Sequence, residues 1–455
     1  MNELVISEMK RVLELQKKKH IEEGPPSLEL RKDRLDRSIS MVKKYQDEII
    51  SALQDDFGNR DPVMSSATEV MSSIGPLENA KKNLAKWMKP EKRKLGGPMP
   101  GAGLLLSALG AKAKIEYQPK GTVGCISPWN FPVNLVMAPL GGILAAGNRV
   151  MIKPSEISSS TSDVIKTMFE EYFDEAEIAV FVGDPEVGAA FSSLPFDHLI
   201  FTGGTSIAKH VMKSASDNLV PLTLELGGKS PVIVGDDVEM SDVAQRVMQG
   251  KTMNAGQICL APDYALVPKE KVDDFVKESI NSVTSMYPEM KDNDDYTSII
   301  NQNHFERIQS YLDDAKSKGA ELVEINPNNE DFSQQPHHKI PPTLVLNPTE
   351  DMKIMQEEIF GPVLPVKPYE DLSETVEYVN SKERPLGLYY FGKDKKDQQY
   401  VLSNTTSGGV TVNDVISHIT QEDLPFGGVG PSGMGSYHGH DGFKEFSHAK
   451  AIYNQ

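Results

Sequence analysis

The sequence predicts an α/β protein built from two open-sheet domains. Its 455 residues correspond to two or three domains at about 150 residues each. From Val123 onward, short apolar runs alternate with helical patterns, as where the apolar run 198–201 precedes a glycine turn and the helical stretch 207–214. The pattern restarts after Pro231. Because strands that alternate with helices indicate βαβ units, a second α/β domain is the simplest interpretation.

The spacing of apolar residues predicts the individual elements. Near the N-terminus, five apolar residues on one helical face predict an amphipathic helix over residues 27–55: Leu35, Ile39, Val42, Ile49 and Leu53. In the first domain we expect strands at 150–152 and 198–201. In the second we expect strands at 232–234 and 342–346 and helices at 271–284 and 304–318. The most apolar segment, 135–152, is interrupted by Pro139 and several glycines, which predicts buried core rather than a membrane span.

Composition and charge exclude several classes of function. The formal net charge is −18, and the main basic cluster, residues 89–94, is short and contains Pro90, so we expect no nucleic-acid partner. The two cysteines, Cys125 and Cys259, allow neither a disulfide framework nor a Cys-rich zinc site. Residues 1–20 are charged and amphipathic, without the apolar centre of a signal peptide. We therefore expect a cytoplasmic protein without an integral membrane segment.

Cys259 and Glu225 are the candidates for chemistry. A lone cysteine is most often a small buried hydrophobe, and a lone glutamate is most often a solvated surface charge. Glu225, however, lies between two leucines at a glycine turn. An apolar surrounding raises a carboxyl pKa by desolvation, which suits a general base near neutral pH. Cysteine is the most nucleophilic ordinary side chain near that pH.

The motifs around these two residues resemble those of the aldehyde dehydrogenase superfamily. The resemblance covers residues from about 30 to 450 and includes the segments 225–230 (Glu-Leu-Gly-Gly-Lys-Ser) and 256–259 (Gly-Gln-Ile-Cys). Further matches lie in the family's order at 127–132, 153–156, 201–205, 357–362 and 425–428. Details at 259–264, 409–414 and 430–439 are most similar to the class 3 branch, which includes fatty, aromatic and coniferyl aldehyde dehydrogenases.

The resemblance implies a particular division of the chain. Residues 1–95 and 116–226 would form a dinucleotide-binding domain, and residues 227–412 a catalytic domain. Residues 96–115 and 413–455 would form an oligomerisation arm and C-terminal segment of a homodimer. The implied activity is NAD(P)-dependent oxidation of a medium- or long-chain aliphatic, aromatic or isoprenoid aldehyde to the acid. Two alternatives stay open: an acyl-transferring or reductive relative on the same fold, and an inactive binding protein.

The resemblance also assigns residue roles. Cys259 would carry the thioester, the Asn130 amide and the Cys259 backbone N–H would bind the oxyanion, and Glu225 would activate the hydrolytic water. The implied cofactor contacts are Trp129, Lys153, Glu156, Gly203, Gly204, Thr205, Glu358 and Phe360. We expect NAD as cofactor, with some use of NADP, because Glu156 would accept from a ribose hydroxyl and repel a 2′-phosphate. We expect no metal.

Three other features are assigned structural roles. The segment 428–433 matches G-x-G-x-x-G but has no preceding strand, so it is predicted to be a loop, and the turn at Gly203 and Gly204 before a helix is the better pyrophosphate site. Cys125 lies in an apolar run and is predicted to be core. His438 and His440 have no third ligand nearby and are predicted to lie in a surface loop.

Overall fold

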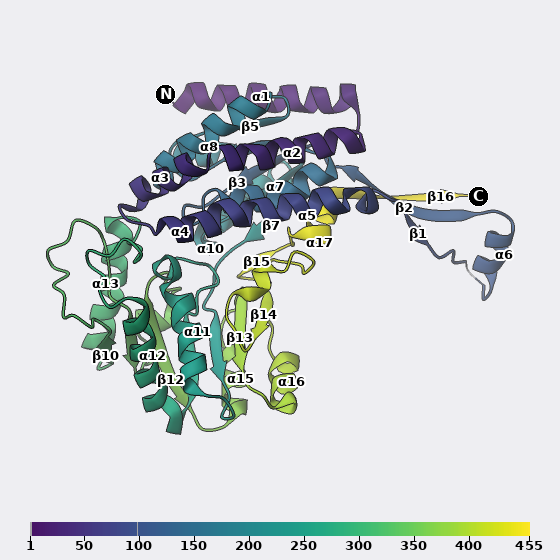
Figure 1. Ribbon diagram of the computed structural model, residues 1–455. Coiled ribbons are helices and arrows are strands. Elements are labelled where there is room, and N and C mark those ends of the chain that lie inside the picture. The colour runs from purple at the N-terminus through teal and green to yellow at the C-terminus, as the bar shows by residue number, and fades with distance from the viewer. Residues whose placement is uncertain (1, 98) are drawn as a thin grey trace.

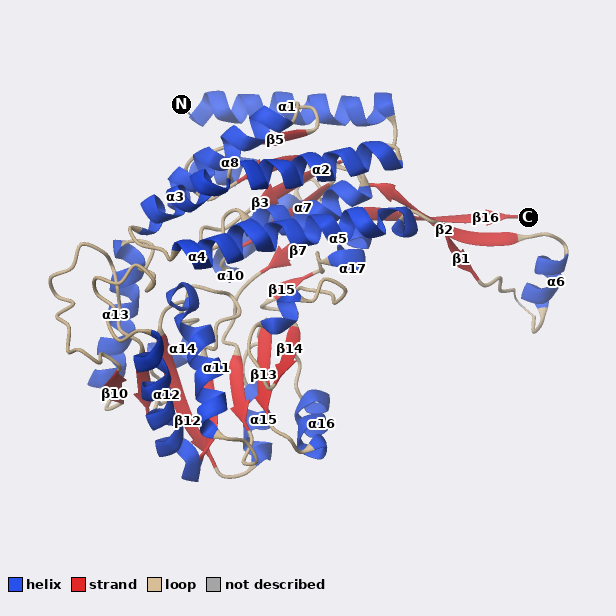
Figure 2. Cartoon of the chain, in the orientation of Figure 1, coloured by secondary structure: helices blue, strands red, loops and turns tan. Residues whose placement is uncertain are grey.

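The protein folds into two α/β lobes from which an extended arm projects, as a computed structural model of residues 2–97 and 99–455 shows (Figure 1). The N-terminal helices stack over one side of the first lobe, and the C-terminal strand ends in the arm (Figure 2). Each lobe has its own central sheet, as the alternating pattern predicts.

The first sheet has six strands in the order β15-β7-β6-β3-β4-β5. Its strands are β3 (Thr122–Ile126), β4 (Arg149–Lys153), β5 (Ile178–Val180), β6 (His198–Thr202), β7 (Leu222–Glu225) and β15 (Gly433–Met434). All pairs are parallel except β15 with β7. Strands β4 and β5 extend to one side of β3, whereas β6 and β7 extend to the other, so the strand order reverses between β3 and β6.

Helices cover both faces of this sheet. The connecting helices are α7 (Asn134–Ala146), η2 (Glu156–Ser158), α8 (Ser159–Tyr172), α9 (Pro185–Ser192) and α10 (Thr205–Ser216). The N-terminal helices are α1 (Asn2–Glu23), α2 (Leu28–Lys44), α3 (Gln46–Phe57), α4 (Pro62–Ser65), the π-helix η1 (Ser66–Met71) and α5 (Ser72–Trp87). Helix α7 is buried along nearly its whole length, so the apolar segment around it is core, as predicted.

The prediction of one helix over 27–55 was wrong. The chain forms α2 and α3, which are separated at Tyr45. Tyr45 has a ψ angle of 16°, which departs from helical geometry. All five apolar residues of the predicted face are nevertheless buried, so the periodicity identified the core side of both helices correctly.

The second sheet has seven strands in the order β10-β11-β12-β9-β8-β13-β14. Its strands are β8 (Pro231–Val234), β9 (Tyr264–Pro268), β10 (Glu321–Glu324), β11 (Thr343–Leu346), β12 (Val363–Tyr369), β13 (Gly387–Phe391) and β14 (Gly409–Val412). Its helices are α11 (Met240–Thr252), η3 (Met253–Gly256), η4 (Lys269–Lys271), α12 (Val272–Met286), α13 (Gln302–Ser317), α14 (Lys353–Gln356), α15 (Leu372–Asn380), α16 (Lys395–Asn404) and η5 (Ser417–Thr420). The strands and helices predicted here fall within two residues of those observed.

The arm is a three-stranded antiparallel sheet that leaves the first lobe (Figure 2). It consists of β1 (Glu91–Arg93), β2 (Lys112–Pro119) and β16 (Ser447–Asn454), with the short helix α6 (Ala102–Ala108) at its tip. The sheet therefore extends beyond the predicted segment 96–115 at both ends. The predicted C-terminal segment also divides, because β15 joins the first sheet and α17 (Gly439–Glu445) packs against α7. Among residues 2–97 and 99–455, no helix combines the length and apolarity needed to cross a bilayer.

Candidate active site

A cavity of about 340 Å³ lies between the two lobes, at the carboxyl edge of the first sheet. It is lined by the turn after β3, the turn after β6, the segment after β7 and residues of the second lobe, among them Trp129, Asn130, Gly203, Gly204, Glu225, Cys259, His304, Arg307, Glu358 and Phe360. The strand order reverses between β3 and β6, so the two connections leave toward opposite faces and open a crevice there. The cavity thus contains most of the site residues predicted from the sequence; Lys153, Glu156 and Thr205 are not among its lining residues.

Cys259 follows a backbone loop in an unusual conformation. Asn254, Ala255 and Gly256 have φ angles of 49°, 51° and 72°, all in the left-handed region. A Cβ at Gly256 would approach the Gly361 carbonyl oxygen to 2.3 Å, which explains the glycine of the motif. Non-glycine residues in this region each cost on the order of 1–3 kcal/mol, and such strain is held mainly at functional sites. The loop fixes the cysteine at the cavity wall.

The Gln257 side chain braces this loop. Its Nε2 donates to the carbonyls of Asn254 and Ser298, both at 3.0 Å, and its Oε1 accepts from the Ile300 backbone N–H at 3.0 Å. The side chain is fully buried. The bond to Asn254 closes the loop on itself, and the bonds to Ser298 and Ile300 join it to a second segment of the same lobe, so the position of Cys259 is set by the core of the second lobe.

Asn130 joins the first lobe to the Cys259 loop. Its Nδ2 donates to the Gln257 carbonyl at 3.0 Å. Its own backbone carbonyl accepts from Arg60 Nη1 at 2.9 Å and from Asn254 Nδ2 at 3.3 Å. The side-chain amide has two N–H groups, so one remains to face the cavity. The asparagine and the cysteine, 129 positions apart in the sequence, therefore belong to one hydrogen-bonded unit.

Glu225 ends β7 and is almost completely buried, with 1% of its surface exposed. Burial raises the pKa of its carboxyl to about 8; a hydrogen bond with the Cys259 thiol opposes this, and the charge of Glu358 adds to it. Burial, followed by the charges of the same two carboxylates, raises the pKa of the Cys259 thiol well above its usual range. At neutral pH the Cys259 thiol is therefore protonated. The Glu225 carboxyl loses its own proton at slightly alkaline pH and can then act as a proton acceptor.

The Glu358 carboxylate lies against Gly227, two residues after Glu225. A Cβ at position 227 would come within 2.1 Å of Glu358 Oε2, so only glycine leaves room for the carboxylate. Burial and then the charge of Asp263 raise the pKa of Glu358 to about 8, against a hydrogen bond from the Gly228 backbone. Nearby, the Trp129 ring packs against Phe360 with centroids 5.4 Å apart. All three side chains, of Trp129, Glu358 and Phe360, line the cavity.

The turn between β6 and α10 presents backbone N–H groups to the cavity. Helix α10 has Gly204 at its N-cap and no side chain that caps it, so its first donors are available to an anion. Gly203 leaves room for the Phe201 ring, which a Cβ would approach to 2.7 Å. The Thr205 hydroxyl, in contrast, donates to the Pro431 carbonyl at 3.3 Å, and Ser206 lines the cavity instead.

Lys153 and Glu156 lie at the carboxyl end of β4, next to β3 in the sheet. Lys153 Nζ donates to the Pro154 carbonyl at 2.8 Å and lies 3.4 Å from Glu156 Oε2. The Glu156 side chain is 40% exposed and the Lys153 side chain only 3%. Neither lines the cavity around Cys259, but both lie on the same edge of the sheet.

Two cavity residues could not be found from the sequence. His304 and Arg307 lie on α13, where they look like members of a solvated helix face. His304 packs against Trp129 with centroids 4.9 Å apart, and Arg307 Nη1 donates to the Ile359 carbonyl at 2.8 Å. Helical spacing gave no signal for either, because the contact is made between elements distant in the sequence.

Three structural assignments have clear outcomes. Cys125 is buried in β3, where burial raises the pKa of its thiol to about 12, so its assignment to the core is confirmed. The segment 428–433 forms a loop and a two-residue strand rather than the start of a helix, as predicted. The surface-loop prediction for His438 and His440 was wrong. His438 is buried at the N-terminus of α17, and His440 lies within α17 and stacks on Trp87.

Comparison with known proteins decides the family. The aldehyde dehydrogenase family model matches residues 17–452 of the chain. The chain belongs to the aldehyde dehydrogenase family. The enzyme is 59% identical over 447 residues to a Caulobacter vibrioides protein named "Probable coniferyl aldehyde dehydrogenase", with 98% of this chain and 91% of the relative covered. It is 52% identical to the coniferyl aldehyde dehydrogenase of a Pseudomonas species, with 97% and 89% covered.

The solved structures agree with the fold. A substrate-bound structure of Staphylococcus aureus AldH is similar with a TM-score of 0.90 and 36% identity, covering 98% of this chain and 93% of that one. The aldehyde dehydrogenase fold expected from the motifs is thereby confirmed, together with the likeness to the class 3 branch. The enzyme is an aldehyde dehydrogenase that oxidises aldehydes with NAD(P).

Cys259 lines the cavity whereas Cys125 is buried in β3, so we predict that a thiol reagent labels Cys259 selectively. With excess iodoacetamide, we expect one label per chain, on Cys259, at a rate that rises with pH because the thiol pKa is raised. Peptide mass spectrometry locates the label. Cys125→Ala should leave the stoichiometry at one and Cys259→Ala should abolish labelling; a label on Cys125 in the folded enzyme would contradict the description of the site.

Proposed function

We propose that the enzyme oxidises aromatic aldehydes of the coniferyl type to carboxylic acids through a thioester on Cys259. The observation that carries the proposal is the placement of Cys259, Asn130 and Glu225 in one cavity, with Asn130 bonded to the loop that holds the cysteine. The two relatives above 50% identity are both named for coniferyl aldehyde. The cavity that holds Cys259 is also lined by the apolar or aromatic side chains of Leu135, Leu226 and Tyr311, and such a lining suits an aromatic ring.

The first half of the proposed reaction takes place at Cys259 and Asn130. Hydride cannot leave an aldehyde carbon until a nucleophile has made that carbon tetrahedral. The Cys259 thiol loses its proton to solvent, the resulting thiolate forms the C–S bond as the carbonyl π bond breaks, and the carbonyl oxygen becomes an oxyanion. The free N–H of Asn130 Nδ2 and the Cys259 backbone N–H donate to that oxyanion. Collapse of the oxyanion expels hydride and leaves the thioester. Removal of one such donor typically costs about 2.7–4 kcal/mol of transition-state stabilisation.

The second half depends on Glu225. Its deprotonated carboxylate takes a proton from water, the resulting hydroxide attacks the thioester carbonyl, and the acid leaves as the C–S bond breaks. The raised pKa matches this role, because a base works best when its pKa is near the working pH. The same residue distinguishes hydrolysis from transfer to another acceptor, since a dedicated base for water favours release of the free acid.

The residues along the sheet edge fit a dinucleotide. The uncapped N-terminus of α10 with Gly203 and Gly204 would hold the pyrophosphate. Lys153 and Glu156 would hold the adenosine ribose, and Glu358 the nicotinamide ribose beside Trp129 and Phe360. The cofactor supplies the hydride acceptor. The Thr205 hydroxyl is less available to the cofactor than these groups, because it donates to the Pro431 carbonyl.

We further propose that the enzyme is a cytoplasmic homodimer assembled through the arm. Strand β16 pairs with β2 over all eight residues, and its other edge has no partner among residues 2–97 and 99–455. An open edge of this length is a template for a strand of a second chain. The division implied by the resemblance belongs to the same proposal: residues 1–95 and 116–226 bind the dinucleotide, residues 227–412 form the catalytic domain, and residues 96–115 and 413–455 form the arm and C-terminal segment. The arm sheet itself consists of β1, β2 and β16.

The substrate assignment predicts a preference that a panel of aldehydes can measure. We expect kcat/KM for 4-hydroxy-3-methoxycinnamaldehyde to exceed that for acetaldehyde about ten- to hundredfold, because burial of a phenyl-sized group contributes ~1.5–3 kcal/mol. NADH absorbance follows the rate, and chromatography follows the free acid with coenzyme A omitted. Equal use of acetaldehyde would refute the aromatic preference, and acid that forms only with coenzyme A would favour the acyl-transferring alternative. Cys259→Ala provides the inactive control.

The setting of Glu156 predicts the choice of cofactor. We expect NAD to be preferred over NADP in kcat/KM, because a carboxylate that accepts from a ribose hydroxyl repels a 2′-phosphate. Glu156→Gln should lower the ratio of kcat/KM for NAD to kcat/KM for NADP, mainly by raising kcat/KM for NADP. Glu170→Gln, at an exposed carboxylate on α8, is the matched control and should leave the ratio unchanged. A wild-type preference for NADP would show that the roles of Lys153 and Glu156 are misassigned.

A further inference from the structure

A buried ion pair lies directly behind Asn130. Arg60, in the loop between α3 and α4, has 1% of its side chain exposed, and Glu69, in the π-helix η1, has 0%. Arg60 Nη2 is 3.0 Å from Glu69 Oε1. Burial raises the pKa of Glu69 to about 7, against the charge of Arg60, and lowers the pKa of Arg60, against the charge of Glu69. Neither residue belongs to the motifs that identify the family.

Both members of the pair hold the turn that carries Asn130. Arg60 Nη1 donates to the Asn130 backbone carbonyl at 2.9 Å. Glu69 Oε2 accepts from the backbone N–H groups of Val133 and Asn134, at 3.0 and 2.9 Å, and so caps the N-terminus of α7. The turn between β3 and α7 is therefore fixed on both sides of Asn130, at its own carbonyl and at the helix that follows.

The guanidinium is also fixed by its aromatic neighbours. It lies 4.7 Å from the centroid of the Phe57 ring and 5.0 Å from that of Phe131, the residue after Asn130. The adjacent Asn59 accepts from the Ser298 backbone N–H at 2.9 Å. The Ser298 carbonyl in turn accepts from Gln257, the brace of the Cys259 loop. The loop 59–60 thus contacts both the asparagine turn and the support of the nucleophile.

We infer that Arg60 and Glu69 are positioning residues that fix the Asn130 amide opposite Cys259. A buried ion pair is a poor source of stability, because desolvation of both charges offsets their attraction. We explain its presence here by its contacts, since the guanidinium donates to the Asn130 carbonyl and also forms an ion pair with the carboxylate that caps α7. The inference rests on the proposed function, because it requires that Asn130 binds the oxyanion.

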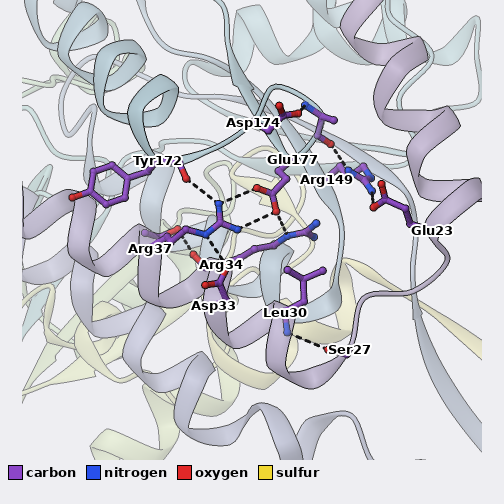
Figure 3. Close-up of polar contacts among 12 residues, drawn as sticks. Glu23, Ser27, Leu30, Asp33, Arg34, Arg37, Arg149, Tyr172, Asp174 and Glu177 are labelled. Atoms are coloured by element: carbon purple, nitrogen blue, oxygen red, sulfur yellow. Dashed lines mark hydrogen bonds and ion pairs between the residues drawn. The ribbon is translucent and has the colours of Figure 1, made fainter.

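A second buried arginine–glutamate pair serves as the control. In Figure 3, Arg34 and Arg37 of α2 converge on Glu177, and none of these three residues lines the cavity. Arg34 is nearly as buried as Arg60, with 4% of its side chain exposed against 1%, and its Nε lies 2.9 Å from Oε1 of Glu177, whose side chain is 19% exposed. Arg34→Lys therefore disturbs a similar pair without touching the turn at Asn130.

The test is a double-mutant cycle between Arg60→Lys and Asn130→Ala. Arg60→Lys keeps the charge but cannot bind both partners in the same geometry, and we expect kcat/KM to fall about ten- to hundredfold, the usual cost of a small misplacement. Asn130→Ala should cost about 10²–10³-fold. In the double variant, Arg60→Lys should add less than about twofold, because the amide it positions is already absent. Arg34→Lys should change kcat/KM less than twofold.

The outcomes separate this inference from the proposed function. If Asn130→Ala keeps full activity, the oxyanion role itself fails. If Asn130→Ala lowers kcat/KM as expected but Arg60→Lys does not, only the positioning inference fails. The same conclusion holds if Arg60→Lys lowers kcat/KM by the same factor in the wild type and in the Asn130→Ala variant. Should Arg60→Lys not fold by circular dichroism, Glu69→Gln takes its place in the same cycle. Failure of both to fold, while Arg34→Lys folds, would assign the pair to stability and overturn the inference.

Discussion

The hydrogen bond from Asn130 to the Gln257 carbonyl joins the two lobes at the wall of the cavity that holds Cys259. One partner lies in the turn after β3 of the first sheet, and the other lies two residues before Cys259 in the second lobe. A shift of one lobe against the other would therefore change the distance between the amide and the thiol. The strained backbone at 254–256 and the braces of Gln257 keep one side of this contact rigid.

The electrostatics of the cavity follow from desolvation. Two carboxylates and a thiol share a region with little water, so the pKa values of Glu225 and Glu358 both rise to about 8, and that of Cys259 rises as well. Burial is the main cause for each group, because it disfavours the charged form, and the charges of neighbouring carboxylates add to it. At neutral pH the Cys259 thiol is therefore protonated, and the Glu225 carboxyl beside it exchanges its proton at a pH of about 8.

The sequence predicted those features that depend on local patterns or motifs. Strands such as β6 and β8 were placed within one residue because buried parallel strands are short apolar runs. Cys259 and Glu225 were found through their motifs, whereas His304 and Arg307 were missed because tertiary contacts bring them to the cavity. The break at Tyr45 and the burial of His438 were missed for the same reason. The Arg60–Glu69 pair lay beyond prediction, since neither residue has an unusual sequence setting.

The most direct test of the account is the fate of the thioester in Glu225→Gln. This change keeps the shape of the side chain but removes the base, so a burst of about one NADH per active site should survive while steady turnover falls ~10²–10⁴-fold. Intact mass should show the acyl group on Cys259. Wild-type turnover should rise with pH through about 8, as Glu225 loses its proton, and the variant should lack that rise. If neither a burst nor an acyl adduct appears at any pH, Glu225 is not the hydrolytic base and the mechanism is wrong.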